Sequence, residues 1–200
     1  MKKLITFLMA FCMLFLMMGC SANNSKKESG HHEEHSIQMW NAANCQQPKT
    51  CAVCGYTEGE LGDHSVKVGT CHHCNEFQNK ELFDKIKTDL TDLTTDLKVA
   101  YDFLQEKSSD SSSNELVYAV AIETVSPTFD KEKAKLEKVL EACGEYEELA
   151  DIKRQVETSL KYYPVKSAGT TLQESKEYIT NARMCYTYML EALNYTQFVS

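Results

Sequence analysis

The sequence predicts a mainly α-helical protein, in which a small cysteine-rich module is followed by an antiparallel up-and-down bundle of three to four helices. Two observations lead to this prediction. Five of the nine cysteines lie within residues 37–77, a stretch with little aliphatic content. From residue 78 to residue 200, apolar side chains recur at the three- and four-residue spacing of amphipathic helices. We therefore expect one domain at 37–77 and a second at 78–200.

The N-terminus has the three parts of an export signal. Residues 1–19 contain two lysines, an apolar run and a small residue directly before Cys20. The apolar run is shorter than the roughly 20 residues that a transmembrane helix needs, which favours a cleaved signal over a permanent anchor. The segment LMMGC at residues 16–20 resembles the lipobox of bacterial lipoproteins, whose cysteine is acylated and becomes the mature N-terminus. This resemblance implies lipidation of Cys20 and a location on the extracytoplasmic face of the cell membrane.

Residues 20–36 are expected to consist of the lipidated cysteine and a disordered tether. Positions 21–36 contain one alanine and no larger apolar side chain, so ordering them would not be offset by burial. His31, Glu34 and His35 match H-x-x-E-H, a metalloprotease signature that requires a helix in a cleft. In a polar tether we interpret them as solvated, with a weak metal-collecting patch as the alternative.

The charge and the motifs exclude several functional classes. The formal net charge is −8, and loss of the signal removes two further lysines, so the surface repels phosphate and nucleic acid is not an expected partner. The chain has no G-x-S-x-G motif and no phosphate-binding glycine loop. We therefore expect no enzymatic activity.

The first predicted helix carries one apolar seam and ends in the serine-rich run 108–113. The seam consists of Phe83, Ile86, Leu90, Leu93, Leu97, Ala100 and Leu104. A second helix is predicted from Ser112, where Glu115 lies at the position of a capping-box partner.

Proline and glycine mark the remaining helix boundaries. Pro127 is expected to separate the second helix from a third at 129–162, with a kink or break at Gly144. A final helix is predicted from Thr171, with Glu174 completing a capping box. Since the connections are short, neighbouring helices should run antiparallel.

Two Cys-x-x-Cys pairs separated by sixteen residues predict a structural zinc site. The four predicted ligands are Cys51, Cys54, Cys71 and Cys74. Gly55 and Asn75 follow the pairs, and both residue types tolerate the positive φ that such knuckles need. Four cysteines leave no open position on Zn²⁺, so the ion would fold the module rather than catalyse a reaction. Disulfide bonds and a redox-active Cys-x-x-Cys remain as alternatives.

The segment ANCQQPKTCAVCGYTEGELGDH, residues 43–64, resembles a short cysteine-rich motif repeated in surface proteins of Gram-positive bacteria. The resemblance covers about residues 40–75 and implies a zinc-ribbon-like module with one metal held by three cysteines and one histidine. Carried over to this chain, those ligands are Cys45, Cys51, Cys54 and His64. Cys45 and His64 are therefore the alternates to the predicted set.

The last two cysteines are predicted to be buried free thiols. If the turn that connects the third helix to the final helix centres near residue 167, Cys143 and Cys185 are offset by about 9 Å along these neighbouring helices. This offset is too large for a disulfide.

These features predict a surface-anchored, non-catalytic lipoprotein. Its structural Zn²⁺ module would support a helical bundle that contacts a protein partner, and its lipid would bind the membrane. One alternative is metal handling, in which the tether histidines and spare ligands collect Zn²⁺. A less favoured alternative is an exported thiol redox protein, in which Cys51 or Cys71 would have a lowered pKa.

Overall fold

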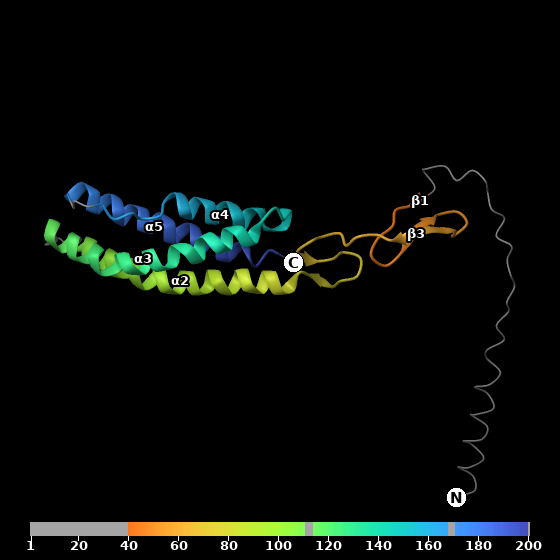
Figure 1. The fold of residues 1–200 in the computed structure, drawn as a ribbon, viewed down its shortest axis with the longest axis horizontal. Coiled ribbons are helices and arrows are strands. Elements are labelled where there is room, and N and C mark those ends of the chain that lie inside the picture. The colour runs from red at the N-terminus through yellow and green to blue at the C-terminus, as the bar shows by residue number, and fades with distance from the viewer. Residues whose placement is uncertain (1–39, 111–113, 168–170, 200) are drawn as a thin grey trace, which may run out of the picture.

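The protein is a four-helix bundle with a small strand-and-loop module at one end (Figure 1). The computed structural model describes residues 40–110, 114–167 and 171–199. The predicted signal, Cys20, the tether histidines and Ser112 lie outside the described residues. The mainly helical class, with a cysteine-rich module before a bundle, is confirmed.

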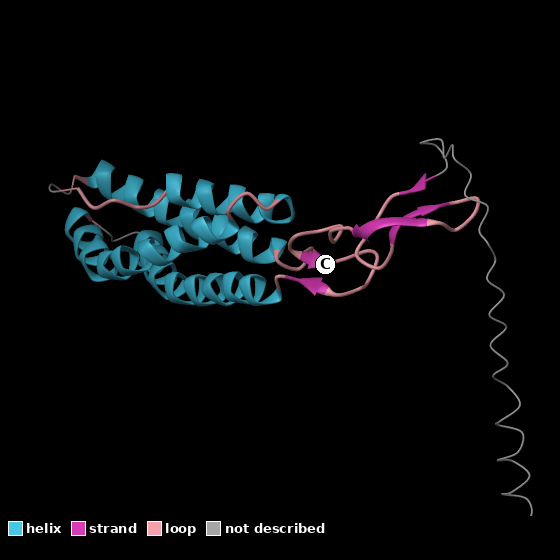
Figure 2. Ribbon diagram, turned by 45° about the vertical axis from the view of Figure 1, so that its right-hand side comes forward, coloured by secondary structure: helices cyan, strands magenta, loops and turns pink. Residues whose placement is uncertain are grey.

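The module consists of two small antiparallel sheets, and Figure 2 shows how much of the rest of it is loop. The first sheet has the order β1-β2-β3, and β4 pairs with β5. The strands are β1 (Trp40–Asn41), β2 (Pro48–Cys51), β3 (Thr57–Leu61), β4 (Gly69–Thr70) and β5 (Phe77–Gln78). One Cys-x-x-Cys turn connects β2 to β3 and the other connects β4 to β5. The two predicted cysteine pairs therefore lie in separate hairpins.

The module has almost no hydrophobic core of its own. Among residues 40–78, the buried residues are Cys51, Val68, Gly69 and Cys71. All five residues of β3 are exposed. So little buried apolar surface cannot offset the conformational entropy of ordering the loops, which points to another source of stability.

The bundle is built from long antiparallel helices. The elements are α2 (Lys80–Ser109), α3 (Glu115–Cys143), the 3₁₀ turn η2 (Glu147–Leu149), α4 (Ala150–Lys161) and α5 (Leu172–Tyr195). All seven residues of the predicted seam on α2 are buried, so that prediction is confirmed. α2 packs against α3 and α5, and α4 packs against α5 and α3. The helices run alternately up and down the bundle, and the C-terminus of α5 lies on the side of the bundle that carries the module (Figure 1).

The prediction that Pro127 separates two helices is wrong, because α3 passes through this residue without interruption. The buried face before the proline, including Ile122 and Val125, continues after it with Phe129 and Leu136 at the same helical spacing. Packing of this continuous face outweighs the cost of roughly 3 kcal/mol for an interior proline.

The predicted helix ends are mostly confirmed. The chain breaks at Gly144, which has a φ of 49° directly after α3. The backbone N–H of Glu174 donates to the Thr171 side chain and the Glu174 carboxylate accepts from the Thr171 N–H, which completes the predicted capping box. The predicted start of the second helix is wrong by two residues, because the N-cap of α3 is Asn114 and Glu115 is the first helical residue. The side-chain oxygen of Asn114 accepts from two backbone N–H groups of the first turn.

Cys143 and Cys185 are fully buried and free, as predicted. Burial raises the pKa of each thiol to about 11. The hydroxyl of Ser159 on α4 donates to the Cys185 carbonyl oxygen at 2.9 Å, which ties α4 to α5 in the core. These thiols are packing residues with little reactivity.

Within the described ranges, none of the helices combines the length and the apolar character needed to span a bilayer.

The continuity of α3 generates a prediction for Pro127, whose side chain is exposed. Replacement of Pro127 by alanine should raise the free energy of unfolding by about 1–3 kcal/mol, because it restores a backbone N–H and relieves the ring's clash with the preceding turn. Urea unfolding followed by circular dichroism measures this difference. The exposed Lys138→Ala change on the same helix is the matched control and should alter stability by less than about 0.5 kcal/mol. A lower free energy of unfolding for the Pro127→Ala variant would contradict this prediction and show that Pro127 stabilises α3.

Candidate metal centre

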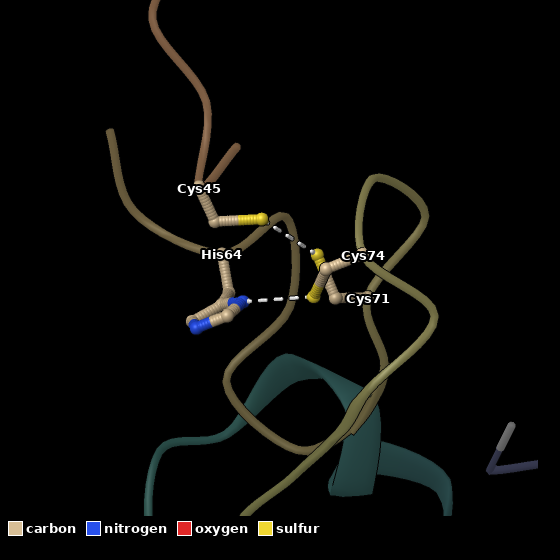
Figure 3. A group of neighbouring side chains, drawn as sticks. All are labelled: Cys45, His64, Cys71 and Cys74. Carbon is tan, nitrogen blue, oxygen red and sulfur yellow. Dashed lines mark hydrogen bonds between the residues drawn. The ribbon is translucent and has the colours of Figure 1, made fainter. Parts of the chain in front are cut away.

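Three separate segments of the module bring four potential ligands together (Figure 3). Cys45 comes from the turn between β1 and β2, and His64 from the loop after β3. Cys71 and Cys74 come from the knuckle between β4 and β5. One ligand atom from each residue lies within 4.8 Å of the other three. The structure therefore contains a Cys₃His group that could hold a metal ion.

The separations within the group fit a tetrahedral ion. The Sγ atoms of Cys45 and Cys71 are 3.6 Å apart, and Cys74 Sγ is 3.5 Å from His64 Nδ1. Bond lengths of about 2.3 Å to sulfur and 2.0–2.1 Å to nitrogen put tetrahedral ligand atoms roughly 3.5–3.8 Å apart. Small shifts of side chains would complete the coordination.

The Cys71 knuckle is held by backbone hydrogen bonds. The Cys71 N–H donates to the Glu76 carbonyl and the Asn75 N–H donates to the Cys71 carbonyl, both at 2.9 Å. Asn75 has a φ of 60°, so the positive φ expected here is confirmed. This geometry lets both sulfurs of the knuckle face the same point.

A close backbone approach holds Cys45 beside His64. The Gly62 N–H donates to the carbonyl of Asn44 at 2.9 Å. A Cβ atom on Gly62 would stand only 2.7 Å from the carbonyl oxygen of Ala43. Since only glycine fits at this distance, Gly62 allows the two ligand-bearing loops to touch.

Ser65 supports the site without being a ligand, and its role could not be predicted from the spacing of cysteines and histidines. Its hydroxyl donates to Cys71 Sγ at 3.4 Å and accepts from the His72 N–H at 3.0 Å. The side chain thus orients the sulfur and fixes the start of the knuckle.

The thiols of the group differ in proton affinity. The hydrogen bond from Ser65, together with the backbone N–H of Cys74, lowers the pKa of Cys71 to about 4. Burial and hydrogen bonds to the Cys71 and Cys74 thiols raise the pKa of Cys45 to about 12. At neutral pH, Cys71 is a thiolate and Cys45 keeps its proton. A metal ion must displace the Cys45 proton, so its affinity falls as the pH is lowered.

The structure divides the sequence-predicted ligands between two places. Cys71 and Cys74 belong to the Cys₃His group, and the alternates Cys45 and His64 complete it. Cys51 and Cys54 are not part of this group; they lie at the turn between β2 and β3, whereas Cys45 precedes β2 and His64 follows β3.

The second knuckle has its own features. Cys51 is buried and Cys54 is exposed. Backbone N–H groups of Cys54 and Val53 donate to Cys51 and lower the pKa of its thiol.

The donor set selects a class of ion. Thiolates and imidazole bind zinc and similar borderline or soft metals, whereas Ca²⁺ and Mg²⁺ prefer oxygen ligands. No carboxylate belongs to the group, and His72 and His73 are exposed outside it. The site therefore fits a thiophilic transition metal.

Comparison with protein-family models, with curated proteins and with solved structures found no match to this chain.

The close contact at Gly62 predicts a loss of affinity that involves no ligand. Gly62→Ala should weaken metal binding by about tenfold or more, because the added Cβ forces apart the loops that carry Cys45 and His64. Competition between the protein and a chelator for Co²⁺, followed by its absorption spectrum, measures the affinity. Asp63→Ala changes the neighbouring exposed residue and should leave the affinity unaltered. Equal affinities of the two variants would contradict this role for Gly62.

Proposed function

We propose that this chain is a non-catalytic lipoprotein on the extracytoplasmic face of the cell membrane. A lipid on Cys20 anchors it, and a structural Zn²⁺ ion held by Cys45, His64, Cys71 and Cys74 folds the module. The module connects the anchor to the helical bundle, which contacts a protein partner. The observation that carries this proposal is the Cys₃His group in a module with almost no apolar core of its own.

The contacts between module and bundle support a mechanical role for the ion. Val68 comes from the loop after His64 and is buried in the core of the bundle, with 1% of its surface exposed. The rings of Phe77 and Phe83 pack with centroids 5.4 Å apart. Since these contacts lie directly before and after the knuckle that carries Cys71 and Cys74, an ion that orders the knuckle would also orient the bundle.

The ligand number supports a structural rather than a catalytic ion. Zn²⁺ is four-coordinate in most protein sites, and catalytic sites keep one position for water. Three cysteines and one histidine occupy all four positions. No water molecule would then be activated at the ion.

The position of the first described strand supports the anchoring scheme. β1, which begins at Trp40, lies at the end of the module remote from the bundle (Figure 1). A chain attached to the membrane upstream of Trp40 would therefore hold the bundle away from the attachment point. The 30 residues of α2 extend the molecule by about another 45 Å.

An exposed apolar groove supports a protein partner on the bundle. It lies between α2 and α3 and is lined by Phe103, Leu116 and Val120, among others. Leu116 is 71% exposed. Exposed apolar clusters of this kind mark interaction surfaces more often than isolated apolar side chains do.

Metal handling is the second candidate function, and one observation favours it. His64 is exposed at the edge of the group, beside a cleft lined by Glu145, Glu147 and Glu148. Carboxylates at the open edge of a thiolate site attract cations. In this case the bound ion would exchange rapidly.

A thiol redox function is the third candidate, favoured by the lowered pKa values of Cys51 and Cys71. The same backbone N–H groups that stabilise a thiolate also prepare it for a metal. Slow alkylation of the metal-loaded chain and fast alkylation after chelation would support the structural ion, whereas fast alkylation of the loaded chain would support redox chemistry.

Removal of the ion should unfold the module and leave the bundle intact. After treatment with a strong chelator, we expect proteases to cut within residues 42–76, while the helical circular dichroism signal stays nearly unchanged, because the bundle has its own core. His64→Ala should reproduce this sensitivity without chelator, and His73→Ala, an exposed neighbour outside the group, should not. Slow release of one Zn²⁺ at this site supports the structural role, and rapid exchange supports metal handling. An intact, protease-resistant module in the chelated chain would overturn the proposal.

The lipid anchor predicts a change of location. In the producing bacterium, Cys20→Ala should abolish incorporation of labelled palmitate and move the chain out of the membrane fraction, because no acyl chain is attached. Cys143→Ala alters a buried thiol of the bundle and should leave labelling and location unchanged. Membrane retention of the Cys20→Ala chain without label would show that a different segment anchors it.

A further inference from the structure

Two sulfurs of the Cys₃His group, from different segments of the chain, are in van der Waals contact. The Sγ atoms of Cys45 and Cys71 are 3.6 Å apart, and the two side chains point toward each other (Figure 3). The third sulfur faces the imidazole, because Cys74 Sγ lies 3.5 Å from His64 Nδ1. Since the S–S bond of a disulfide is about 2.05 Å long, the Cys45 and Cys71 sulfurs would have to approach each other by about 1.5 Å to form one.

A bond between these sulfurs would join the same segments that a metal ion joins. Cys45 lies in the turn between β1 and β2, and Cys71 begins the knuckle between β4 and β5, 26 residues later. A covalent link across a loop of this length restricts the unfolded chain and so stabilises the folded one. A Cys45–Cys71 disulfide would therefore replace the ion as the restraint on a module with almost no apolar core.

The three sulfurs of the group differ in their access from solvent. Cys45 and Cys74 are half-buried, whereas Cys71 is fully buried, with 0% of its surface exposed. A small oxidant therefore reaches Cys45 before it reaches Cys71. Once Cys45 is oxidised, the buried Cys71 sulfur is at contact distance to react with it.

We propose that the Cys₃His group is a redox switch, in which a peroxide converts Cys45 and Cys71 from metal ligands into a disulfide. This switch rests on the proposed structural ion and adds a regulation to it. The module would exist in two cross-linked forms, one held by the ion and one held by the disulfide.

The reaction balances with hydrogen peroxide as the two-electron oxidant. In the metal-loaded site, the cysteine sulfurs are thiolates. The Cys45 thiolate attacks one peroxide oxygen, the O–O bond breaks, and a sulfenic acid and a hydroxide ion form. The Cys71 thiolate then attacks the Cys45 sulfur, so that the S–S bond forms and the S–OH bond breaks to release a second hydroxide ion. The two sulfurs lose two electrons, and the peroxide gains them.

Formation of the disulfide leaves an incomplete ligand set. His64 and Cys74 retain one nitrogen and one sulfur, whereas a structural zinc ion needs four donors. Oxidation should therefore release the ion while the loops stay restrained. Removal of the ion by a chelator leaves the same loops without a restraint. A dithiol reductant cleaves the disulfide and restores the ligands.

Oxidation of the zinc-loaded full chain in detergent tests the switch. The chain carries Cys51→Ser and Cys54→Ser, so that the other knuckle does not consume oxidant. Hydrogen peroxide is added in steps, a zinc-binding dye measures the released ion, and mass spectrometry of non-reduced peptides identifies the linked cysteines. We expect release of the ion, a Cys45–Cys71 link, a Cys74 thiol that can still be alkylated, and continued protease resistance of residues 42–76.

Two ligand exchanges separate the switch from general oxidation of the site. Cys45→His and Cys74→His each leave two cysteines and two histidines, so both variants keep four donors for Zn²⁺. The Cys74→His variant retains the Cys45–Cys71 pair and should release zinc at close to the parental rate. The Cys45→His variant lacks the pair and should release zinc at least about tenfold more slowly.

Several results would overturn the switch. They are an ion that peroxide does not release, a link between Cys71 and Cys74 in place of the proposed one, loss of protease resistance on oxidation, and equal release from the two histidine variants. If either variant fails to load zinc, the peptide map of the parental chain decides. The metal content before oxidation tests the proposed function separately. A chain without zinc would overturn both proposals, whereas a loaded chain that fails any of these tests would overturn the switch alone.

Discussion

The N-terminal module brings three sulfurs and one nitrogen within 4.8 Å of one another. Val68 is the one aliphatic side chain buried among the described residues 40–78, and it packs into the bundle rather than within the module. The loops are polar, so ordering them costs conformational entropy that no apolar core offsets. An ion held by Cys45, His64, Cys71 and Cys74 would supply that stability, because metal binding to such a site is coupled to folding.

The ligand loops also join the two halves of the protein. The backbone N–H of Lys67 donates to the carboxylate of Glu148, at the start of the helices that return along the bundle, with a distance of 2.9 Å. Phe77 leaves the Cys71 knuckle and packs against Phe83 on the first turns of α2. The loops that carry the Cys₃His group are thus in direct contact with η2 and α2. In the proposed lipoprotein, this coupling would let a short module set the direction of a long bundle.

The helices show where local rules suffice and where they fail. The seam from Phe83 to Leu104 was predictable because a helical period is a property of neighbouring residues, and the Thr171–Glu174 capping box was predictable for the same reason. Pro127 led to a wrong prediction because an interior proline does destabilise a helix, through the loss of a backbone hydrogen bond and a clash with the preceding turn. This destabilisation is outweighed by burial of Phe129 and its neighbours against other helices, which no local pattern reports.

The sequence by itself determined the helical class, the buried seam and the two knuckles, whose spacing and following residues encode the turn within a few positions of each other. Only the tertiary structure decided that the Cys71–Cys74 knuckle is the one that Cys45 and His64 join. Cys45 and His64 join the Cys71 knuckle because Gly62 lets their loops touch and because Ser65 binds the Cys71 sulfur. Those contacts link residues brought together by the path of the strands. Cysteine spacing reports the turns, but the coordination sphere is assembled from distant loops, so the choice of ligands depends on the folded chain.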